Sequence, residues 1–282
     1  MFFRKKHFEN MQSFKINLDE LSTIEKQVLI KKPKLIIGVV SPNDRLKQVG
    51  DLLKNKFPSS QIILSTTAGE LCTRPNKNDD LYICHDVNIL KQTSIVLQIF
   101  SEKMIDDLQI EEINLFCDDI KSGNLKYSLK ERIQKLTSEV SKIKLKIKNA
   151  NCDNTFALTL IDGSSASESF LMEALYKSEK FPFLFVGGSS GGLKIVGNAP
   201  SLDLSETFLY SNGKLLKSMA VLLFVKLKNN YRYGIFKTHN YQVVNDTRFN
   251  VLEGSLEFRK ITKVLFKENQ NSLTQNLADY FK

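Results

Sequence analysis

The residues best placed to do chemistry form a glycine–serine loop, GGSSGG at 187–192, directly after the apolar run 183–186. An apolar run of this length is typical of a buried strand, and glycines let the backbone after it approach a bound group closely. Backbone N–H groups and two hydroxyls can hold an anion such as a carboxylate without any catalytic side chain. The loop therefore favours a binding site over a reaction centre.

Two more polar loops follow apolar runs. The segment STTAGE at 65–70 comes after the run 61–64, and DGSS at 162–165 comes after the run 155–161. Ligands of α/β sheets gather outside the carboxyl ends of strands, so we expect the three loops to face one crevice. Asp162 or Glu70 would then pair with an ammonium group. Two plainer interpretations stay open, because the loops can be tight turns of small residues and Asp162 can be a helix N-cap.

The glycine–serine loop does not fit the motifs of nucleotide-binding enzymes. Gly187 and Gly192 have the spacing of GxxxxGK[ST], but Leu193 stands where the lysine must be. The glycines form two doublets, which excludes GxGxxG. The letters GxSxG do occur at 187–191, yet the segment 193–200 lacks the helix pattern that must follow a nucleophile elbow.

A hydrolase is an alternative hypothesis. Ser189 would be the first-choice nucleophile, with Ser190 or Thr67 behind it, and His239 would be the base. A third hypothesis is an interaction scaffold whose loops hold no ligand.

The elements that must position the three loops follow a repeated order. Residues 34–40 predict a strand, apolar spacings of three and four predict a helix over 43–57, and a second strand follows at 61–64. The same order returns later, with a strand at 155–161, a helix at 168–180 and a strand at 183–186. Each βαβ-like unit predicts a pair of parallel strands. The similarity also suggests an internal duplication, although few residues match between the halves.

The segment between the two units adds further elements. Strands are predicted at 81–85 and 94–100, whereas 104–121 is mixed and acidic without a clear period. Apolar residues in helical spacing over 124–148 predict one long helix, with room for a single break.

A β-hairpin follows the second unit. Asn212-Gly213 lies between apolar arms at 207–211 and 214–226, and this dipeptide favours a two-residue type I′ turn. Residues 231–236 could add an edge strand, and the amphipathic pattern from 256 to the end predicts a helix. The fold class is therefore α/β, with mixed β-sheets flanked by helices and two βαβ-like units followed by a β-hairpin.

Composition argues for a globular protein. The 282 residues are 42% hydrophobic and 25% charged, which fits neither a disordered chain nor a membrane bundle. The net charge is +9, and much of the excess lies at 4–6, 31–34 and 142–148. The last of these alternates lysine with Ile and Leu and has no aromatic residues to stack on bases. We therefore interpret the lysines as solvated helix faces and expect no nucleic-acid partner.

The cysteines and the start of the chain indicate a cellular location. Four widely spaced cysteines form no CxxC pair, so we expect no metal, no disulfide framework and no cofactor. The first residues lack the apolar stretch of a signal peptide, and no run reaches the ~20 apolar residues of a membrane span. A cytoplasmic protein without membrane insertion is the simplest expectation.

The order of motifs resembles the FIST domain, the F-box and intracellular signal transduction family. STTAGEL at 65–71 is similar to the family's G-C-S-T-A-G-E block, and LIDG at 160–163 is similar to its D-G strand end. VGGSSG at 186–191 is similar to its V-G-G-S-A-G loop. The hairpin YSNGK at 210–214 and the strand at 220–224 follow where the family has them.

The resemblance implies a cytoplasmic bacterial sensory domain that binds small ligands, amino acids among them, and acts on an output domain or protein. Residues 33–228 would be the family's N-terminal domain. An extension at 1–32 would precede it, and a partial C-terminal region or linker at 229–282 would follow. The oligomeric state stays open.

The leading hypothesis is therefore a sensor that binds its ligand without converting it. Backbone N–H groups and hydroxyls of the loops would hold a carboxylate, and an acidic side chain would pair with an amine. The expected ligand-binding residues are Thr66, Thr67, Gly69, Glu70, Asp162, Gly163, Gly187, Gly188, Ser189, Ser190 and Gly191.

Overall fold

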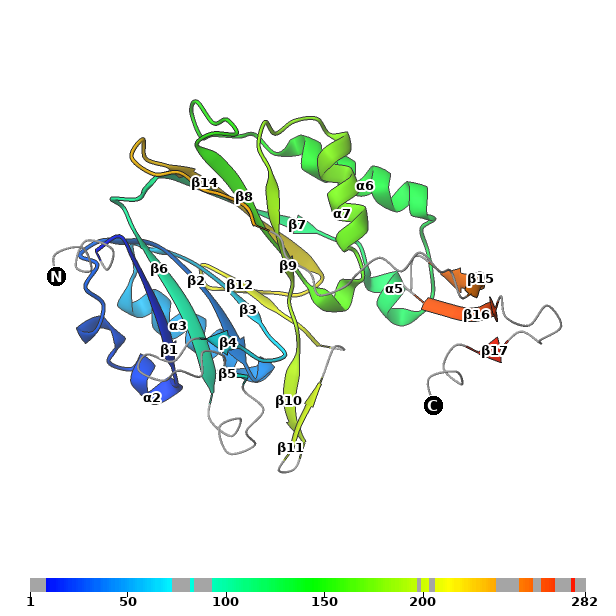
Figure 1. The fold of residues 1–282 in the computed structure, drawn as a ribbon, viewed down its shortest axis with the longest axis horizontal. Coiled ribbons are helices and arrows are strands. Elements are labelled where there is room, and N and C mark those ends of the chain that lie inside the picture. The colour runs from blue at the N-terminus through cyan, green and yellow to red at the C-terminus, as the bar shows by residue number, and fades with distance from the viewer. Residues whose placement is uncertain are drawn as a thin grey trace.

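Two β-sheets pack face to face, and helices cover their outer faces (Figure 1). The structure is a computed structural model. It describes residues 9–72, 82–83, 93–196, 199–202, 206–236, 249–255, 260–266 and 275–276. The mixed α/β class expected from the sequence is confirmed.

The first half of the chain supplies most of the first sheet. Its order is β1-β6-β2-β3-β12-β13, in which β2 and β3 are parallel, as the first βαβ-like unit predicted. The elements are β1 Met11–Ile16, α2 Leu18–Leu21, η1 Ile24–Lys26, β2 Pro33–Ser41, η2 Asn43–Arg45, α3 Leu46–Lys56, β3 Gln61–Thr66, β4 Leu71–Cys72, β5 Tyr82–Ile83 and β6 Ser94–Ser101.

The second half forms the second sheet, in the order β7-β14-β8-β9. Here β8 and β9 are parallel, which confirms the second βαβ-like unit. The elements are β7 Ile105–Asn114, α5 Asp118–Ser122, α6 Leu129–Lys142, β8 Thr155–Ile161, η3 Gly163–Ser165, α7 Glu168–Lys177, β9 Phe185–Ser189, β10 Leu193–Val196, β11 Ala199–Leu202, β12 Leu209–Ser211, β13 Lys214–Leu216 and β14 Met219–Leu227.

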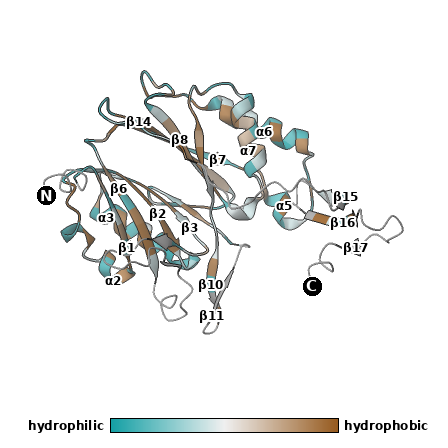
Figure 2. Ribbon diagram, in the orientation of Figure 1, coloured by the Kyte–Doolittle hydropathy of each residue, from teal (hydrophilic) through white to brown (hydrophobic). Residues whose placement is uncertain are grey.

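Buried apolar residues form the cores between the layers, and Figure 2 colours much of the strands as hydrophobic. On α3, Leu46, Val49 and Leu53 recur at helical spacing and pack on the outer face of the first sheet. The α6 and α7 helices pack on the outer face of the second sheet. Between the sheets, side chains of β2 and β3 meet side chains of β14, Leu35 and Leu223 among them. Successive apolar residues of β2 and β8 thus point to opposite faces of their sheets, so each sheet has a core on both of its faces.

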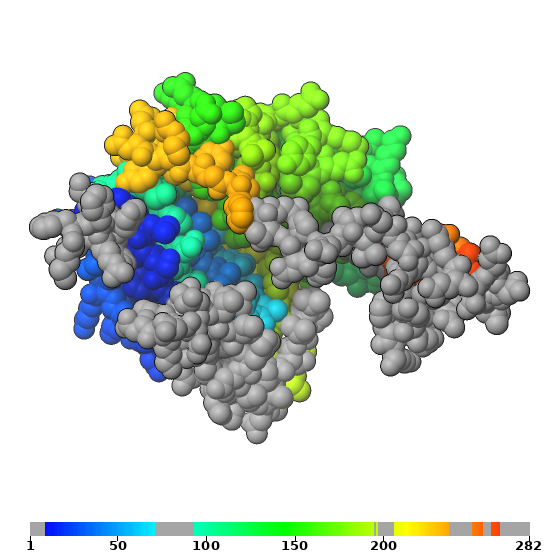
Figure 3. Space-filling model, viewed as in Figure 1, coloured from blue at the N-terminus to red at the C-terminus, as the bar shows by residue number. Residues whose placement is uncertain are grey.

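The two halves share one topology. Each half gives four strands to its sheet, β1, β2, β3 and β6 in the first and β7, β8, β9 and β14 in the second, with a helix (α3 or α7) between the second and the third. In each sheet the fourth of these strands lies between the first and the second. The space-filling view shows the first half, blue to cyan, adjoining the second, whose colours run from green to yellow (Figure 3). This arrangement supports the duplication that the sequence suggested.

One row of paired residues across each sheet defines which residues of the two halves correspond. In the first sheet the row is Gln12, Ile99, Ile36 and Ile62. In the second sheet the matching row is Gln109, Phe224, Ala157 and Phe185. The two glutamine side chains also have the same role, because each bonds to backbone groups of another segment. Gln12 accepts hydrogen bonds from the backbone at Leu29 and Ile30, and Gln109 bonds to the backbone at Lys144 and Lys146.

Several sequence predictions were wrong at element boundaries. Residues 105–114 form β7, although the acidic sequence showed no clear period. The helix predicted over 124–148 begins at a capping box of Ser128 and Glu131 and already ends at Lys142. Beyond it, the Gln109 side chain holds the backbone of 144–146 in place of helical hydrogen bonds.

The predicted hairpin is confirmed at its turn and in the arms beside it, where β12 pairs antiparallel with β13. Asn212 and Gly213 both have positive φ, 47° and 102°, as a type I′ turn requires. The second arm is interrupted at 217–218, so that β13 stays in the first sheet while β14 lies in the second.

The C-terminal predictions were also wrong where they can be compared. Residues 231–236 are not a strand. The segment predicted as helix holds β16 Lys260–Phe266 and β17 Gln275–Asn276. In a small sheet, β16 pairs with both β15 Phe249–Ser255 and β17. Leu273, Leu277 and Phe281, on which that helix depended, lie outside the described residues. Within the described ranges, no helix is long and apolar enough to cross a membrane.

Part of the predicted N-terminal extension belongs to the first sheet. Met11–Ile16 pairs with β6 along its whole length, and Leu21 and Ile24 are buried in the core beside α3. Those contacts tie residues 11–24 to the folded unit.

Candidate functional site

The three predicted loops meet at the carboxyl ends of the parallel strands. The Gly191 N–H donates to the Thr66 carbonyl at 3.2 Å, and the Ser190 N–H donates to the Ile161 carbonyl at 2.8 Å. The Gly163 N–H donates to the Ser190 hydroxyl at 3.0 Å. Gly187, Gly188 and Ser189, however, belong to β9, so the loop proper begins at Ser190.

Glycine is required where the loops touch. A Cβ on Gly163 would lie 1.9 Å from the Ser190 carbonyl oxygen, and one on Gly191 would lie 2.6 Å from the Ala68 nitrogen. Both distances are far below ordinary van der Waals contact. These two glycines therefore serve the packing of loop on loop.

Asp162 is the centre of a buried network formed with Lys121, Ser164, Thr207 and Ser218, here called the Asp162 network. Its Oδ1 accepts from Thr207, from the Ser164 hydroxyl at 2.7 Å and from the Ser164 N–H at 3.0 Å. Its Oδ2 accepts from the Ser218 N–H at 2.6 Å and from Lys121 Nζ at 3.1 Å. Protein donors thus engage both oxygens of this carboxylate.

The network keeps Asp162 charged. Burial alone would raise its pKa, but hydrogen bonds from Thr207, Ser164 and the Ser218 backbone, with the nearby Lys121, lower the pKa below its ordinary value. A charged, fully bonded aspartate ties η3 to the segments before β12 and β14.

Glu70 is buried at the end of the first loop. Its two oxygens accept from the hydroxyls of Ser41, at 2.9 Å, and Ser94, at 2.8 Å. Burial raises its pKa, and these two hydrogen bonds only partly offset that effect. Glu70 thus links the loop to the ends of β2 and β6.

The remaining predicted residues have local partners. The Thr66 hydroxyl accepts from the Phe208 N–H at 3.0 Å, and the Thr67 hydroxyl donates to the Gly69 carbonyl at 2.7 Å. The Ser189 hydroxyl donates to Glu168 Oε1 at 2.5 Å. His239, the base of the hydrolase alternative, lies outside the described residues.

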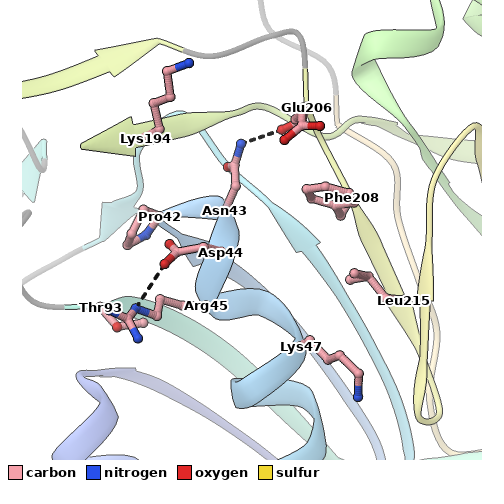
Figure 4. Close-up of a pocket in the computed structure, with 10 residues that line it drawn as sticks. All are labelled: Pro42, Asn43, Asp44, Arg45, Lys47, Thr93, Lys194, Glu206, Phe208 and Leu215. Carbon is pink, nitrogen blue, oxygen red and sulfur yellow. Dashed lines mark hydrogen bonds and ion pairs between the residues drawn. The ribbon is translucent and has the colours of Figure 1, made fainter. Parts of the chain in front are cut away.

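A cavity of about 480 Å³ lies beside these loops, where β2 ends and α3 begins (Figure 4). We call it the Asn43 cavity. None of the predicted ligand-binding residues lines it. The lining residues are Pro42, Asn43, Asp44, Arg45, Lys47, Thr93, Lys194, Glu206, Phe208 and Leu215.

The predicted loops nevertheless build the walls of this cavity. The Asn43 side chain donates to the Glu206 carbonyl at 2.5 Å and accepts from the Leu193 N–H at 2.9 Å. Glu206 precedes Thr207 of the Asp162 network, and Leu193 follows the glycine–serine loop. Asn43 therefore clamps the ends of two loop segments against the start of α3.

The cavity presents both signs of charge beside an apolar wall. Among the lining residues, Arg45, Lys47 and Lys194 are cationic, and Asp44 and Glu206 carry carboxylates. Asp44 and Arg45 are 3.5 Å apart in an exposed ion pair, and Glu206 pairs with Lys217 at 3.2 Å. Exposed pairs of this kind contribute about 0–1 kcal/mol, so a ligand can replace them at little cost.

Sequence reasoning missed the cavity because its residues come from four separate segments. One signal was present: Pro42-Asn43-Asp44 stands at the end of a strand and the start of a helix, which is a common ligand position in α/β folds. Nothing in the sequence brings Phe208 and Leu215 to that position. Among the described residues, no cluster of three or more His, Cys, Asp or Glu could hold a metal.

Comparison with protein-family models shows what the chain is similar to. A family model, the FIST N domain, matches residues 34–253, which include β2 through β14 and all the loops described above. A search of curated proteins found no match.

Proposed function

The chain belongs to the FIST family, a family of sensory signal-transduction domains, and from this premise we propose that it senses a small zwitterionic ligand in the Asn43 cavity. Free amino acids are the simplest members of that class. Binding occurs without chemical conversion.

The observation that carries the proposal is the lining of the cavity. Its volume of about 480 Å³ falls in the range of small-molecule sites. Arg45 and Lys194 suit a carboxylate, Asp44 and Glu206 suit an ammonium group, and Phe208 with Leu215 offers an apolar wall to a side chain. A zwitterion satisfies both signs of charge at once, whereas a simple anion would leave the carboxylates opposed to it.

The buried loops have a supporting role in this proposal. Asp162 and Glu70 have their oxygens engaged by protein donors, so we assign them to holding the loops rather than to the ligand. Direct ligand contacts by Thr67, Gly69 or Ser189 stay a prediction, as do a cytoplasmic location and an output partner.

The test is a thermal-shift screen of the twenty free amino acids and their decarboxylated and deaminated analogues. Selective binding raises the melting temperature because the ligand stabilises only the native state. A zwitterion should raise it, and the analogues that lack either charge should raise it less.

Two variants locate the binding. Arg45→Ala removes a cation from the cavity, and Leu215→Glu places a charge on its apolar wall. Leu125→Glu is the matched control, because Leu125 is 44% exposed and Leu215 is 42% exposed. Loss of the shift in both cavity variants, with the control unchanged, supports the site. An unchanged shift in both cavity variants overturns it.

A further inference from the structure

The outer edge of β9 is the feature that the proposed sensory site does not use. Within the described residues, β9 pairs only with β8, so it is an edge strand of the second sheet. We propose that this edge pairs with β9 of a second copy of the chain, antiparallel and across a twofold axis. The two second sheets would then become one continuous sheet.

The internal repeat shows that this edge position accepts an antiparallel strand. In the first sheet the counterpart of β9 is β3, because Ile62 and Phe185 stand in the matching rows. The far side of β3 pairs antiparallel with β12. No described strand occupies the corresponding side of β9.

In β9, as in β3, the backbone N–H and C=O groups of every second residue point to the outer side of the strand, and the matching residues of the two strands do so. The Thr66 N–H donates to the Phe208 carbonyl, and the Ile62 carbonyl accepts from the Asn212 N–H, so residues 62 and 66 face β12. On β9 the Leu184 carbonyl and the Ser190 N–H bond to β8, so even-numbered residues face β8. Residues 185, 187 and 189 therefore direct both N–H and C=O to the outer edge.

Several residues of β9 are accessible in the described part of the chain. Gly187, Gly188 and Ser189 are exposed, and a Cβ on Gly188 would meet nothing within 4 Å. Exposed apolar side chains flank the start of the strand, because Leu184 is 52% exposed and Tyr176 on α7 is 59% exposed. Residues 185–189 include no charged residue and no proline, the residue types that commonly protect an edge strand from pairing. Glu168 does give this strand a charged contact, because its carboxylate accepts from the Ser189 hydroxyl.

The strand is complementary to itself. In an antiparallel pair centred on Gly187, the N–H and C=O of Gly187 would bond to those of Gly187 in the second copy. The N–H and C=O of Phe185 would bond to those of Ser189 in the second copy. Phe185 then stands opposite Ser189, and Val186 opposite Gly188, so each large side chain faces a small one. This self-complementarity favours a second copy over an unrelated strand, and it is what a twofold interface requires.

Sedimentation velocity over a range of concentrations tests the proposal. The wild-type chain should form a dimer, and Gly188→Lys should be monomeric, because each lysine would stand opposite Val186 of the other copy, and lysines on an edge strand oppose pairing. Leu29→Lys is the control, since Leu29 is 62% exposed and lies outside β9. It should dimerise like the wild type. Circular dichroism should show that all three chains are folded.

A cysteine pair fixes the register. The double variant Val186→Cys/Gly188→Cys should form disulfide-linked dimers, because facing residues of a non-hydrogen-bonded pair have Cα atoms about 4.5 Å apart. Val186→Cys alone should link far less. A monomeric wild type overturns the proposal, and so does a dimer that Gly188→Lys leaves intact.

Discussion

At the scale of single residues, the acidic side chains that looked like ligand groups hold the protein together. Asp162 accepts five hydrogen bonds from protein donors, and Glu70 accepts two from buried hydroxyls. Their residue types and loop positions were visible in the sequence. The sequence did not show that their carboxylate oxygens accept hydrogen bonds from the protein itself, because the donors Lys121, Thr207 and Ser94 come from distant segments.

The raised pKa of Glu70 gives stability a defined pH dependence. Its native pKa lies above the ordinary value of 4.5, so the unfolded chain releases this proton at lower pH than the native chain does. The contribution of Glu70 to stability therefore falls as the pH rises from 4.5 through the native pKa. Glu70→Gln should gain stability relative to the wild type over that rise, as urea unfolding at several pH values would show. A difference that does not change with pH would contradict this.

Removing a second buried carboxylate, Asp119, should change the free energy of unfolding much more than the Glu70 substitution does. Arg132 binds Asp119 through both of its terminal nitrogens, at 3.1 and 2.8 Å, and the pair is buried. Burial opposes ionisation of Asp119, but Arg132 and the backbone of 126–127 lower its pKa to about 2. Asp119→Ala should reduce the free energy of unfolding by about 3–5 kcal/mol, because Arg132 would stay buried without its partner.

An exposed ion pair is the control for that measurement. Lys142 and Glu139 pair at 2.5 Å on the surface of α6. Glu139→Ala should cost at most about 1 kcal/mol in the same urea titration. Equal losses for the two variants would show that the Asp119–Arg132 pair has no special role.

At the scale of elements, the sequence predicted each βαβ unit because local signals determine it. Apolar periodicity, Pro42 at the start of a helix and the Asn212-Gly213 turn all act within a few residues. The missed β7 and the shortened α6 depend on contacts across the sheet, above all on Gln109 binding the backbone of 144–146. The pairing of distant segments, which makes the Asn43 cavity, has no local signal.

The glycines at the loop junction provide a test at this scale. Gly163→Ala places a methyl group 1.9 Å from the Ser190 carbonyl oxygen, so the loops must separate. We expect a loss of about 1–3 kcal/mol in the free energy of unfolding. Gly234→Ala is the matched control, because Gly234 is exposed, lies outside β9 and its Cβ would meet nothing within 4 Å. Similar urea midpoints for the two variants would contradict this account of the junction.

At the scale of the whole molecule, the two halves share a topology but differ at one edge. The β12–β13 hairpin extends the first sheet and brings Phe208 and Leu215 to the Asn43 cavity. In the second half, the position that matches Asn43 is Ser164, which belongs to the Asp162 network. In the part of the chain that the structure describes, the Asn43 cavity is therefore built on the first half, and its counterpart position in the second half is taken up by the Asp162 network.

This asymmetry predicts the stoichiometry of binding. Calorimetric titration with a zwitterion from the screen should give one ligand per chain, because the matching position in the second half is filled by protein hydrogen bonds. Two equivalent sites per chain would show that the halves bind alike.

The central claim, that the ligand occupies the Asn43 cavity, is tested most directly by amide hydrogen exchange with and without that ligand. Protection should rise at 43–47, at 193–194 and at 206–215, the segments that line the cavity. Residues 226–230, which line a separate polar hollow with Asn149 and Asn154, should be unaffected. Protection confined to that hollow, with none at 43–47, would contradict the account.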